Sequence, residues 1–415
     1  MAPAKSDLVA EATFTYEWLE RVLQNCFETK ERFVKFDSER IGHMQGAACR
    51  IVRVQMEWSN AGSEGQTLPG SVVLKLPSMG NLMELKAKSK HVDNLDVDSF
   101  WPKLVKMHNC ECAAYAYLNS FENDVKRPKC HYIQPIDDEN PNGLLIFEDL
   151  RLRNGNVAPL LKEPPLALVL EIAAEIAKLQ AYSLKHGDWT GSSDLRIYLD
   201  YLIEPNSQLN VSHRREIFGL MKSEFSAEFA PEFVAKCRSL YEDKEFMAYS
   251  NTLHEKLNMA PVMVHGDLFN VYNIFLDSHH RLLAFLDWQA VHPGSICEDL
   301  ARFLCFVLSP ATRREQTTPI LSHYYRTLQN YCLQLDMTVP FTFEAVQRAY
   351  REVFKYAAMT HALVSIHMAR QEGVGLLEMI IEKERVGAAK AHLLAIGKGL
   401  LEDVLALELE SKCSW

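Results

Sequence analysis

The residues best suited to chemistry are two aspartates and an asparagine that follow one another closely. Asp267 lies in a polar loop, Asn270 and Asn273 come shortly after it, and Asp287 follows a short apolar run. Transfer of a γ-phosphoryl group needs a carboxylate that orients the attacking hydroxyl and accepts its proton, and oxygen ligands that hold Mg²⁺ against the phosphates. The pattern therefore predicts Asp267 as the base. Asp287 and either Asn273 or Asn270 are the predicted metal ligands.

Two short apolar runs flank these residues and predict the strands that hold them. Val262 to Val264 precedes the polar loop, and Leu282 to Leu286 precedes Asp287. Helical patterns cover most of the chain around this interruption. They span residues 165–186, 196–203, 211–225, 231–257, 298–308, 317–335, 343–369 and 374–410. The second part of the chain is therefore expected to be mainly helical, with a small β insertion at the candidate site.

The first part of the chain has a more β-rich pattern. Residues 14–36 predict an amphipathic helix, whereas residues 52–58 and 71–76 predict two strands joined by a long polar loop as a hairpin. Helix and irregular structure are expected over residues 80–100, a helix over 104–120 and a short strand over 144–147. The expected architecture is a small β-rich part up to about residue 150 and a larger helical part beyond it.

Several segments match a known pattern in the correct order. They are Ile41 to Gly46, Val72 to Leu76, His108 to Glu111 with Tyr115, Leu145 to Leu150, His265-Gly266-Asp267-Leu268 with Asn273-Ile274, Leu286-Asp287-Trp288-Gln289, and Gly294 with Asp299 to Leu304. Together they resemble the aminoglycoside/choline phosphotransferases, and most closely the ecdysteroid-kinase-like, or CHK-kinase-like, family. The resemblance runs from about residue 40 to residue 310.

The resemblance implies a role for several further residues. Lys75 would hold the α- and β-phosphates of ATP, and Glu111 would pair with Lys75. Gly42 and Gly46 take the place of the glycine-rich loop, and Glu148 and Leu150 lie in the hinge under adenine. ATP and Mg²⁺ are the implied cofactors, and a hydroxyl of a small molecule is the implied acceptor.

The resemblance also implies a bilobal, protein-kinase-like α+β fold. The N-terminal lobe is expected over residues 1–147, the hinge over 148–151 and the helical C-terminal lobe over 152–415. In this family the metal-binding Asn follows the catalytic Asp by five positions, whereas Asn273 follows Asp267 by six. An extra residue bulged between Leu268 and Tyr272 would reconcile the two, so Asn273 is preferred over Asn270. Relatives also commonly have His where this chain has Gln180.

Composition excludes some other classes of function. The chain has 415 residues, a net charge of -10 and no basic stretch suited to a phosphate backbone, so nucleic acid is not an expected partner. Its ten cysteines show no zinc-site spacing. Neither a signal peptide nor an apolar run of about 18 residues is present, so a soluble cytoplasmic protein without a membrane partner is expected.

Two alternative functions stay open at the level of the sequence. A protein kinase is disfavoured, because Gly266 replaces the Arg beside the catalytic Asp and neither Asp-Phe-Gly nor Ala-Pro-Glu follows it. A catalytically silent pseudokinase, acting as a binding or regulatory module, is favoured by the irregular Asp267–Asn273 interval. The family resemblance indicates a steroid or another lipophilic alcohol as acceptor. Gln289 is neutral where choline kinases tend to place an acid, which disfavours choline.

Overall fold

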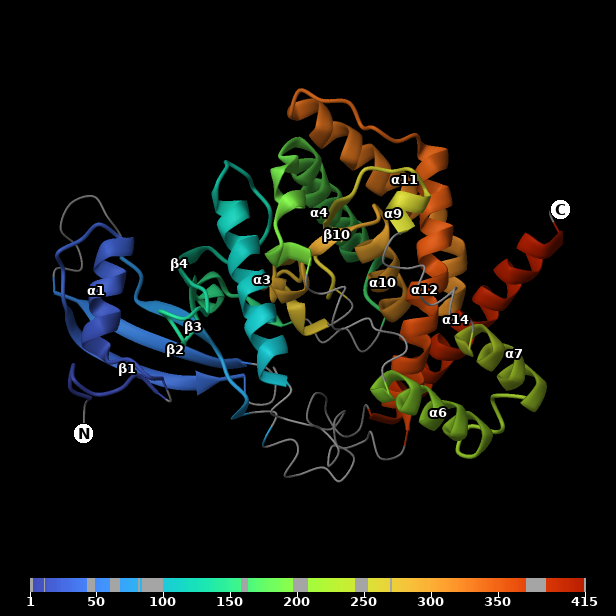
Figure 1. Ribbon diagram of the computed structural model, residues 1–415, viewed down its shortest axis with the longest axis horizontal. Coiled ribbons are helices and arrows are strands. Elements are labelled where there is room, and N and C mark those ends of the chain that lie inside the picture. The colour runs from blue at the N-terminus through green and yellow to red at the C-terminus, as the bar shows by residue number, and fades with distance from the viewer. Residues whose placement is uncertain are drawn as a thin grey trace. The chain divides into compact units, whose positions relative to one another are not determined.

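The structure is a computed structural model of the chain (Figure 1). It describes residues 3–10, 12–42, 49–59, 68–80, 83, 100–157, 163–196, 208–242, 253–268, 271–370 and 386–413. The chain forms two compact units. The first contains Met1–Asn156, Phe275–His279 and Leu283–Ala290, and the second contains Val157–Ile274, His280–Leu282 and Val291–Trp415. The segment that carries Asp287 therefore belongs to the first unit, although most of its neighbours in the sequence belong to the second.

A five-stranded antiparallel sheet forms the centre of the first unit. Its strands are β1 (Phe33–Ile41), β2 (Cys49–Trp58), β3 (Ser71–Pro77), β4 (Cys130–Gln134) and β5 (Leu144–Glu148), in the order β1-β2-β3-β5-β4. The predicted hairpin over residues 52–58 and 71–76 is confirmed as β2 and β3, whereas β4 was not predicted. In this register Lys75 on β3 lies between Ile51 on β2 and Leu145 on β5.

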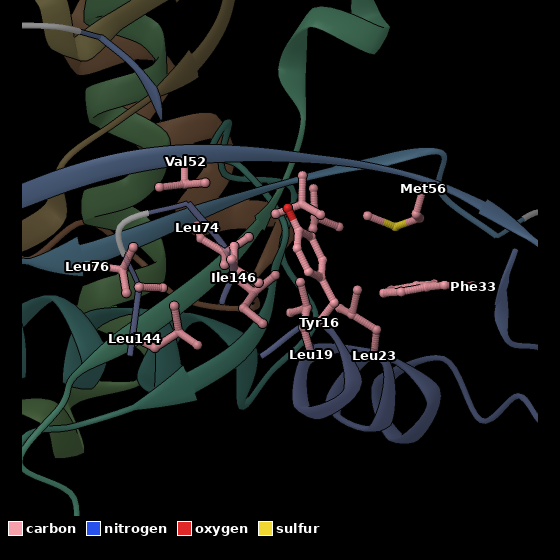
Figure 2. Packing of buried hydrophobic residues seen from close by; sticks show 14 of the residues in the cluster. Tyr16, Leu19, Leu23, Phe33, Val52, Met56, Leu74, Leu76, Leu144 and Ile146 are labelled. Carbon is pink, nitrogen blue, oxygen red and sulfur yellow. The ribbon is translucent and has the colours of Figure 1, made fainter. Parts of the chain in front are cut away.

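Helices α1 (Tyr16–Cys26) and α3 (Trp101–Asn119) contact this sheet. Figure 2 shows Tyr16, Leu19 and Leu23 of α1 pointing toward buried side chains of the sheet, including Leu74 on β3. Because successive side chains of a strand point to opposite faces, Lys75 points away from this apolar cluster. Helix α3 packs at β3 and β4, and it carries the predicted partner of Lys75.

The predicted helix over residues 14–36 is wrong in its second half. Thr15 caps the helix by accepting a hydrogen bond from the Trp18 N–H, and α1 ends at Cys26. Glu28 then adopts a left-handed backbone with φ of 50°, which turns the chain before β1. The backbone N–H of Phe33 donates to the Glu20 carboxylate at 2.5 Å, so the helix holds the first residue of the strand. The apolar spacing of residues 14–23 does not reveal this turn.

The second unit is mostly helical. Its helices are α4 (Leu166–Lys185), α6 (Gln208–Lys222), α7 (Pro231–Glu242), α9 (Leu253–Lys256), α10 (Glu298–Val307), α11 (Pro310–Gln334), α12 (Phe343–Ala369) and α14 (Val386–Cys413). Helix α12 packs against α10 and α14, and α11 packs against α4. The α+β class is confirmed, with the β-rich first part and the mainly helical second part that the sequence predicts.

Several predicted helices need correction at their ends. The predicted helix over 317–335 begins earlier, at Pro310, because Ser309 caps it and Pro319 is accommodated inside it. The predicted helix over 231–257 contains α7 and α9, and the residues between them lie outside the described part. The predicted helix over 196–203, most of that over 80–100 and the start of that over 374–410 also lie outside the described residues.

Short strands complete the structure around the candidate catalytic loop. Strands β7 (Val262–Val264) and β10 (His292–Gly294) form an antiparallel pair. Strands β6 (Asn156–Val157), β8 (Ile274–Leu276) and β9 (Leu282–Phe285) form a three-stranded sheet in the order β6-β8-β9. The predicted runs at 262–264 and 282–286 are thus confirmed as β7 and β9.

The core under α1 generates a prediction about stability. Leu74 is fully buried in this core, so Leu74→Ala should lower the free energy of unfolding by about 2 to 5 kcal/mol. Leu333→Ala is the matched control, because Leu333 is 73% exposed and should cost less than about 0.5 kcal/mol. Urea unfolding of both variants measures the difference. Equal losses in the two variants would show that the core is not where the structure places it.

Candidate active site

Lys75 lies at the centre of a buried charged cluster in the first unit. Its Nζ atom is 2.6 Å from Oε2 of Glu111 and 2.5 Å from Oδ1 of Asp287. These carboxylates come from distant parts of the chain, since Glu111 belongs to α3 and Asp287 follows β9. The structure therefore brings together three residues that the sequence singled out.

Backbone and side-chain contacts fix the two carboxylates of this cluster. Oε1 of Glu111 accepts a hydrogen bond of 3.3 Å from the Trp288 N–H, and Oδ2 of Asp287 accepts one of 3.1 Å from the Gln289 side chain. Asp287 has a φ of 63°, a left-handed conformation that a non-glycine residue adopts only where its surroundings impose it. Each carboxylate thus contacts Lys75 through one oxygen and a neighbouring residue through the other.

The electrostatics of the cluster favour a charged lysine. Burial alone would lower the pKa of Lys75, but the adjacent Asp287 and Glu111 carboxylates outweigh burial and raise the pKa. The side chains of Lys75 and Glu111 are only 10% and 1% exposed, so removing Lys75 would leave the buried Glu111 carboxyl group without its positive partner. The cluster consequently holds a permanent ammonium group at a defined position beside two carboxylates.

The candidate catalytic loop lies in the second unit, directly after β7. The Asp299 carboxylate on α10 accepts hydrogen bonds from the backbone N–H groups of His265, at 2.7 Å, and of Gly266, at 2.9 Å. Burial raises the pKa of Asp299 to about 6, although both backbone N–H groups and Arg302 oppose the shift. Gly266 has a φ of 85°, which explains the glycine at this position. Asp299 therefore braces the loop from a helix start.

Asn273 reaches Asp267 despite the interval of six positions. The Asn273 side-chain amide donates to the Asp267 backbone carbonyl at 3.0 Å and to the Asp267 carboxylate at 2.9 Å. Asn273 ends the short 3-10 helix Val271–Asn273 and is followed at once by β8. Asn270, the alternative, lies outside the described residues. The amide nitrogen of Asn273 faces Asp267, which leaves its carbonyl oxygen as the atom suited to a metal.

Residues that the sequence did not single out hold the other side of this loop. Arg302 donates to the Gly266 carbonyl at 2.7 Å and to the Glu298 carboxylate at 2.6 Å. Nε2 of His292 lies 3.1 Å from the same Glu298 oxygen. The spacing of four between Glu298 and Arg302 on a predicted helix was the available signal, because side chains four apart lie on one helical face. Their contact with the loop could not be read from that spacing.

The remaining predicted residues lie at the end of β5, just after it, and just after β1. Leu150 is buried and begins the 3-10 helix Leu150–Arg153, while the Glu148 side chain accepts a hydrogen bond from the Lys129 N–H. Gly42, with a φ of 65°, directly follows β1, and Gly46 lies outside the described residues. The nucleotide-binding roles of Glu148, Leu150 and Gly42 stay predictions.

Asp149, between the two hinge residues, forms a further buried ion pair that the sequence did not reveal. The Arg53 guanidinium lies 2.6 Å from Asp149, and the Ser71 hydroxyl donates to the same carboxylate at 2.8 Å. Arg53 also contacts Glu39 on β1 at 3.0 Å. This network ties the segment after β5 to three strands of the sheet.

Comparison with known proteins shows the family. A family model described as "Uncharacterized oxidoreductase dhs-27" (DUF1679) matches residues 4–412, so the chain belongs to this family. A relative with the same description, from Caenorhabditis elegans, is 26% identical over 332 residues, which are 77% of this chain and 37% of the relative. "Uncharacterized kinase-like protein D1044.1", also from Caenorhabditis elegans, is 34% identical over 119 residues, which are 28% of this chain and 30% of that protein. The chain thus aligns with much less than half of either relative.

Solved structures also resemble this chain at low similarity. The ethanolamine kinase of Plasmodium vivax matches 88% of this chain and 84% of its own, with 12% identity and a TM-score of 0.39. At that score the likeness carries no argument about function. Among the described residues, no helix combines the length and the apolar character that crossing a membrane requires.

The Glu298 cluster generates a prediction about pH. Burial would raise the pKa of Glu298, but Arg302 and His292 outweigh it and lower the pKa to about 2. Because the folded-state pKa lies below the unfolded one, this stabilisation is present above the unfolded value near 4.5 and is lost as pH falls toward 2. The contribution is of order 3 kcal/mol at neutral pH.

Glu298→Gln should therefore be less stable than the parent chain at pH 7, and the gap should narrow between pH 5 and pH 3. Urea unfolding across this range measures the gap. A gap in stability that stays constant with pH would mean that Arg302 and His292 do not lower the pKa of Glu298. Glu402→Gln is the control, because Glu402 forms an ion pair that is about half exposed and little effect is expected.

Proposed function

We propose that this chain is an ATP- and Mg²⁺-dependent phosphotransferase that acts on a hydroxyl of a small molecule. The observation that carries the proposal is the contact of one buried lysine with Glu111 and with Asp287. Such a lysine is suited to the α- and β-phosphates, and the Asp287 carboxylate at its side would be suited to hold a metal ion that offsets phosphate charge. The family resemblance of these segments and the kinase-like relative support the same class.

Each residue has one role in the proposed reaction. Lys75 holds the α- and β-phosphates, and Glu111 keeps the lysine in place. Asp267 orients the acceptor hydroxyl and takes its proton as the hydroxyl oxygen bonds to the γ-phosphorus and the bond to the leaving ADP oxygen breaks. The contact with the Asn273 amide orients the Asp267 carboxylate.

The donor atoms of the candidate site fit magnesium. Asp287 supplies a carboxylate and Asn273 a side-chain carbonyl oxygen, and oxygen donors of this kind are the ligands that Mg²⁺ prefers. The Asn273 amide nitrogen donates to Asp267, which orients the carbonyl oxygen away from that carboxylate. When bound, Mg²⁺ supplies positive charge to the phosphate oxygens. Asn273 is preferred over Asn270 because β8 anchors it from the next residue onward.

Further residues define the nucleotide and acceptor sites in this proposal. Glu148 and Leu150 contact adenine through backbone groups, and Gly42 and Gly46 lie in the loop over the phosphates. The likeness to ecdysteroid-kinase-like, or CHK-kinase-like, proteins makes a steroid or another lipophilic alcohol the proposed acceptor class. Gln289 donates to Asp287 and brings no charge for a quaternary ammonium group, which disfavours choline.

The word oxidoreductase in the name of one relative does not decide the activity of this chain. The alignment covers 37% of that relative, so the name describes a protein most of which lies outside the aligned segment. The sequence contains no G-x-G-x-x-G segment, the fingerprint of dinucleotide binding. A pseudokinase that binds a nucleotide without transfer is the second candidate, because the Asp267–Asn273 interval is one position longer than the family pattern.

The proposed roles separate binding from transfer. Asp267→Asn should leave the affinity for MgATP within about threefold and lower the transfer rate by at least about 100-fold, because the base acts mainly in the transition state. Asp287→Asn should weaken MgATP binding itself. Calorimetry with MgATP and single-turnover hydrolysis, with water as the acceptor, measure the two effects.

Arg314→Met, a substitution of an arginine whose side chain is half exposed, is the control for both measurements. No MgATP binding by the parent chain would contradict the proposal. Binding without any transfer would favour the pseudokinase, and equal loss of binding in both Asp variants would contradict the assigned roles.

The choice between the two asparagines generates a separate prediction. Mg²⁺ requires near-ideal octahedral geometry, so the loss of a true ligand should strongly lower the affinity for Mg²⁺. Asn273→Ala should raise the Mg²⁺ concentration needed for half-maximal activity by about tenfold or more, whereas Asn270→Ala should change it little. A magnesium titration of both variants measures this, and the reverse result would show that Asn270 is the ligand.

A further inference from the structure

The peptide group between Gly266 and Asp267 is held at both ends. Arg302 donates to its carbonyl oxygen, on Gly266, at 2.7 Å, and its N–H group, on Asp267, donates to Nδ1 of His265 at 3.3 Å. Asp299 holds the two preceding N–H groups, on His265 and Gly266. Three successive peptide groups before the proposed base are therefore fixed by side chains of the second unit.

The peptide group after Gly266 would rotate easily if no hydrogen bond fixed it. A glycine with a φ of 85° lies in a region where rotation of the next peptide group meets little steric resistance. Rotation of this group would turn the direction in which the Asp267 side chain leaves the backbone. Asp299 contacts only N–H groups that precede the peptide, so it does not oppose this rotation directly. Two of the described hydrogen bonds oppose it: the one of 2.7 Å from Arg302 to the carbonyl, and the longer one of 3.3 Å from the N–H group to His265.

Arg302 is itself fixed by buried partners. Its Nη2 atom lies 2.6 Å from Oε1 of Glu298, and Nε2 of His292 lies 3.1 Å from the same oxygen. The exposed fractions of the Arg302, Glu298 and His292 side chains are 14%, 11% and 0%. A Cβ at Gly294 would lie 2.5 Å from the second Glu298 oxygen, so only glycine leaves room for this carboxylate. The Glu298 carboxylate, which orients Arg302, is thus tightly packed.

We infer that Arg302, oriented by Glu298 and His292, is a positioning residue that sets, through the Gly266 carbonyl, the direction in which the Asp267 side chain leaves the backbone, while the Asn273 amide holds the carboxylate itself. This inference rests on the proposed function, because it assigns Arg302 to the transfer step. Arg302 acts through the backbone of the loop and contacts no reacting atom. Its removal should therefore affect the rate of transfer and leave nucleotide binding, which depends on Lys75 and Asp287, nearly unchanged.

The test compares three variants of the full chain. Arg302→Met keeps the apolar stem and removes the guanidinium, Arg302→Lys keeps a charge without the two-pronged geometry, and Arg314→Met is the matched control. Single-turnover ATP hydrolysis, calorimetry with MgATP and amide hydrogen exchange over residues 264–268 are measured for each. Arg302→Met should lower the rate by about 10- to 100-fold, the factor expected for one hydrogen bond to a charged group.

In the same variant MgATP affinity should change by less than about threefold, amide exchange should rise in residues 264–268, and Arg302→Lys should restore part of the rate. A normal rate in Arg302→Met would overturn the inference. So would a parallel loss of affinity and thermal stability, which marks a residue that only supports the fold.

A parent chain that binds MgATP without hydrolysing it would contradict the proposed transfer activity. Amide exchange alone then decides the loop assignment. A rise confined to residues 264–268 supports it, and unchanged exchange overturns it.

Discussion

A buried lysine ammonium is the constraint on which the first unit depends. A charge that is removed from water must be paired, and Lys75 is paired by Glu111 and Asp287. The two partners come from α3 and from the segment after β9, so the chain must return to the first unit after residue 282. Trp288 fixes this segment in the first unit. Its indole N–H donates to the Phe285 carbonyl at 3.0 Å, and its ring centroid lies 6.3 Å from that of Tyr115. The pairing of Lys75 therefore depends on this path of the chain.

The second unit meets a different constraint, the pairing of buried backbone groups. The described pairing of β7 with β10 ends at Val264, and backbone N–H and C=O groups are costly when they are buried without a partner. The first turns of α10 supply side chains of both kinds, since Asp299 accepts from two N–H groups and Arg302 donates to the Gly266 carbonyl. One short helix thus holds the backbone of the loop before Asp267, and Asn273 holds Asp267 itself through its carbonyl and its carboxylate.

The sequence reveals the parts of this architecture that depend on local pattern. The alternation of apolar and polar residues predicts β2 and β3. The order of the family motifs identifies Lys75, Glu111 and Asp287 as candidate site residues before any contact between them is known. Contacts between distant residues could not be predicted in this way, and the Arg53–Asp149 pair shows why. The two residues are 96 positions apart, and the hinge motif that contains Asp149 does not indicate Arg53 as its partner. The end of α1 was missed for a local reason, because the left-handed turn at Glu28 leaves no mark in the spacing of apolar residues.

Counting charges explains why the proposed reaction depends on a metal ion. Lys75 is a single ammonium group, and it already faces the two acidic groups of Glu111 and Asp287. A nucleoside triphosphate adds several negative charges, and repulsion between like charges is strong where burial weakens screening by water. Lys75 cannot offset the phosphates while it also offsets two carboxylates. In the proposed reaction, a divalent cation held by Asp287 would supply the missing positive charge, and Lys75 would then be available to the phosphates.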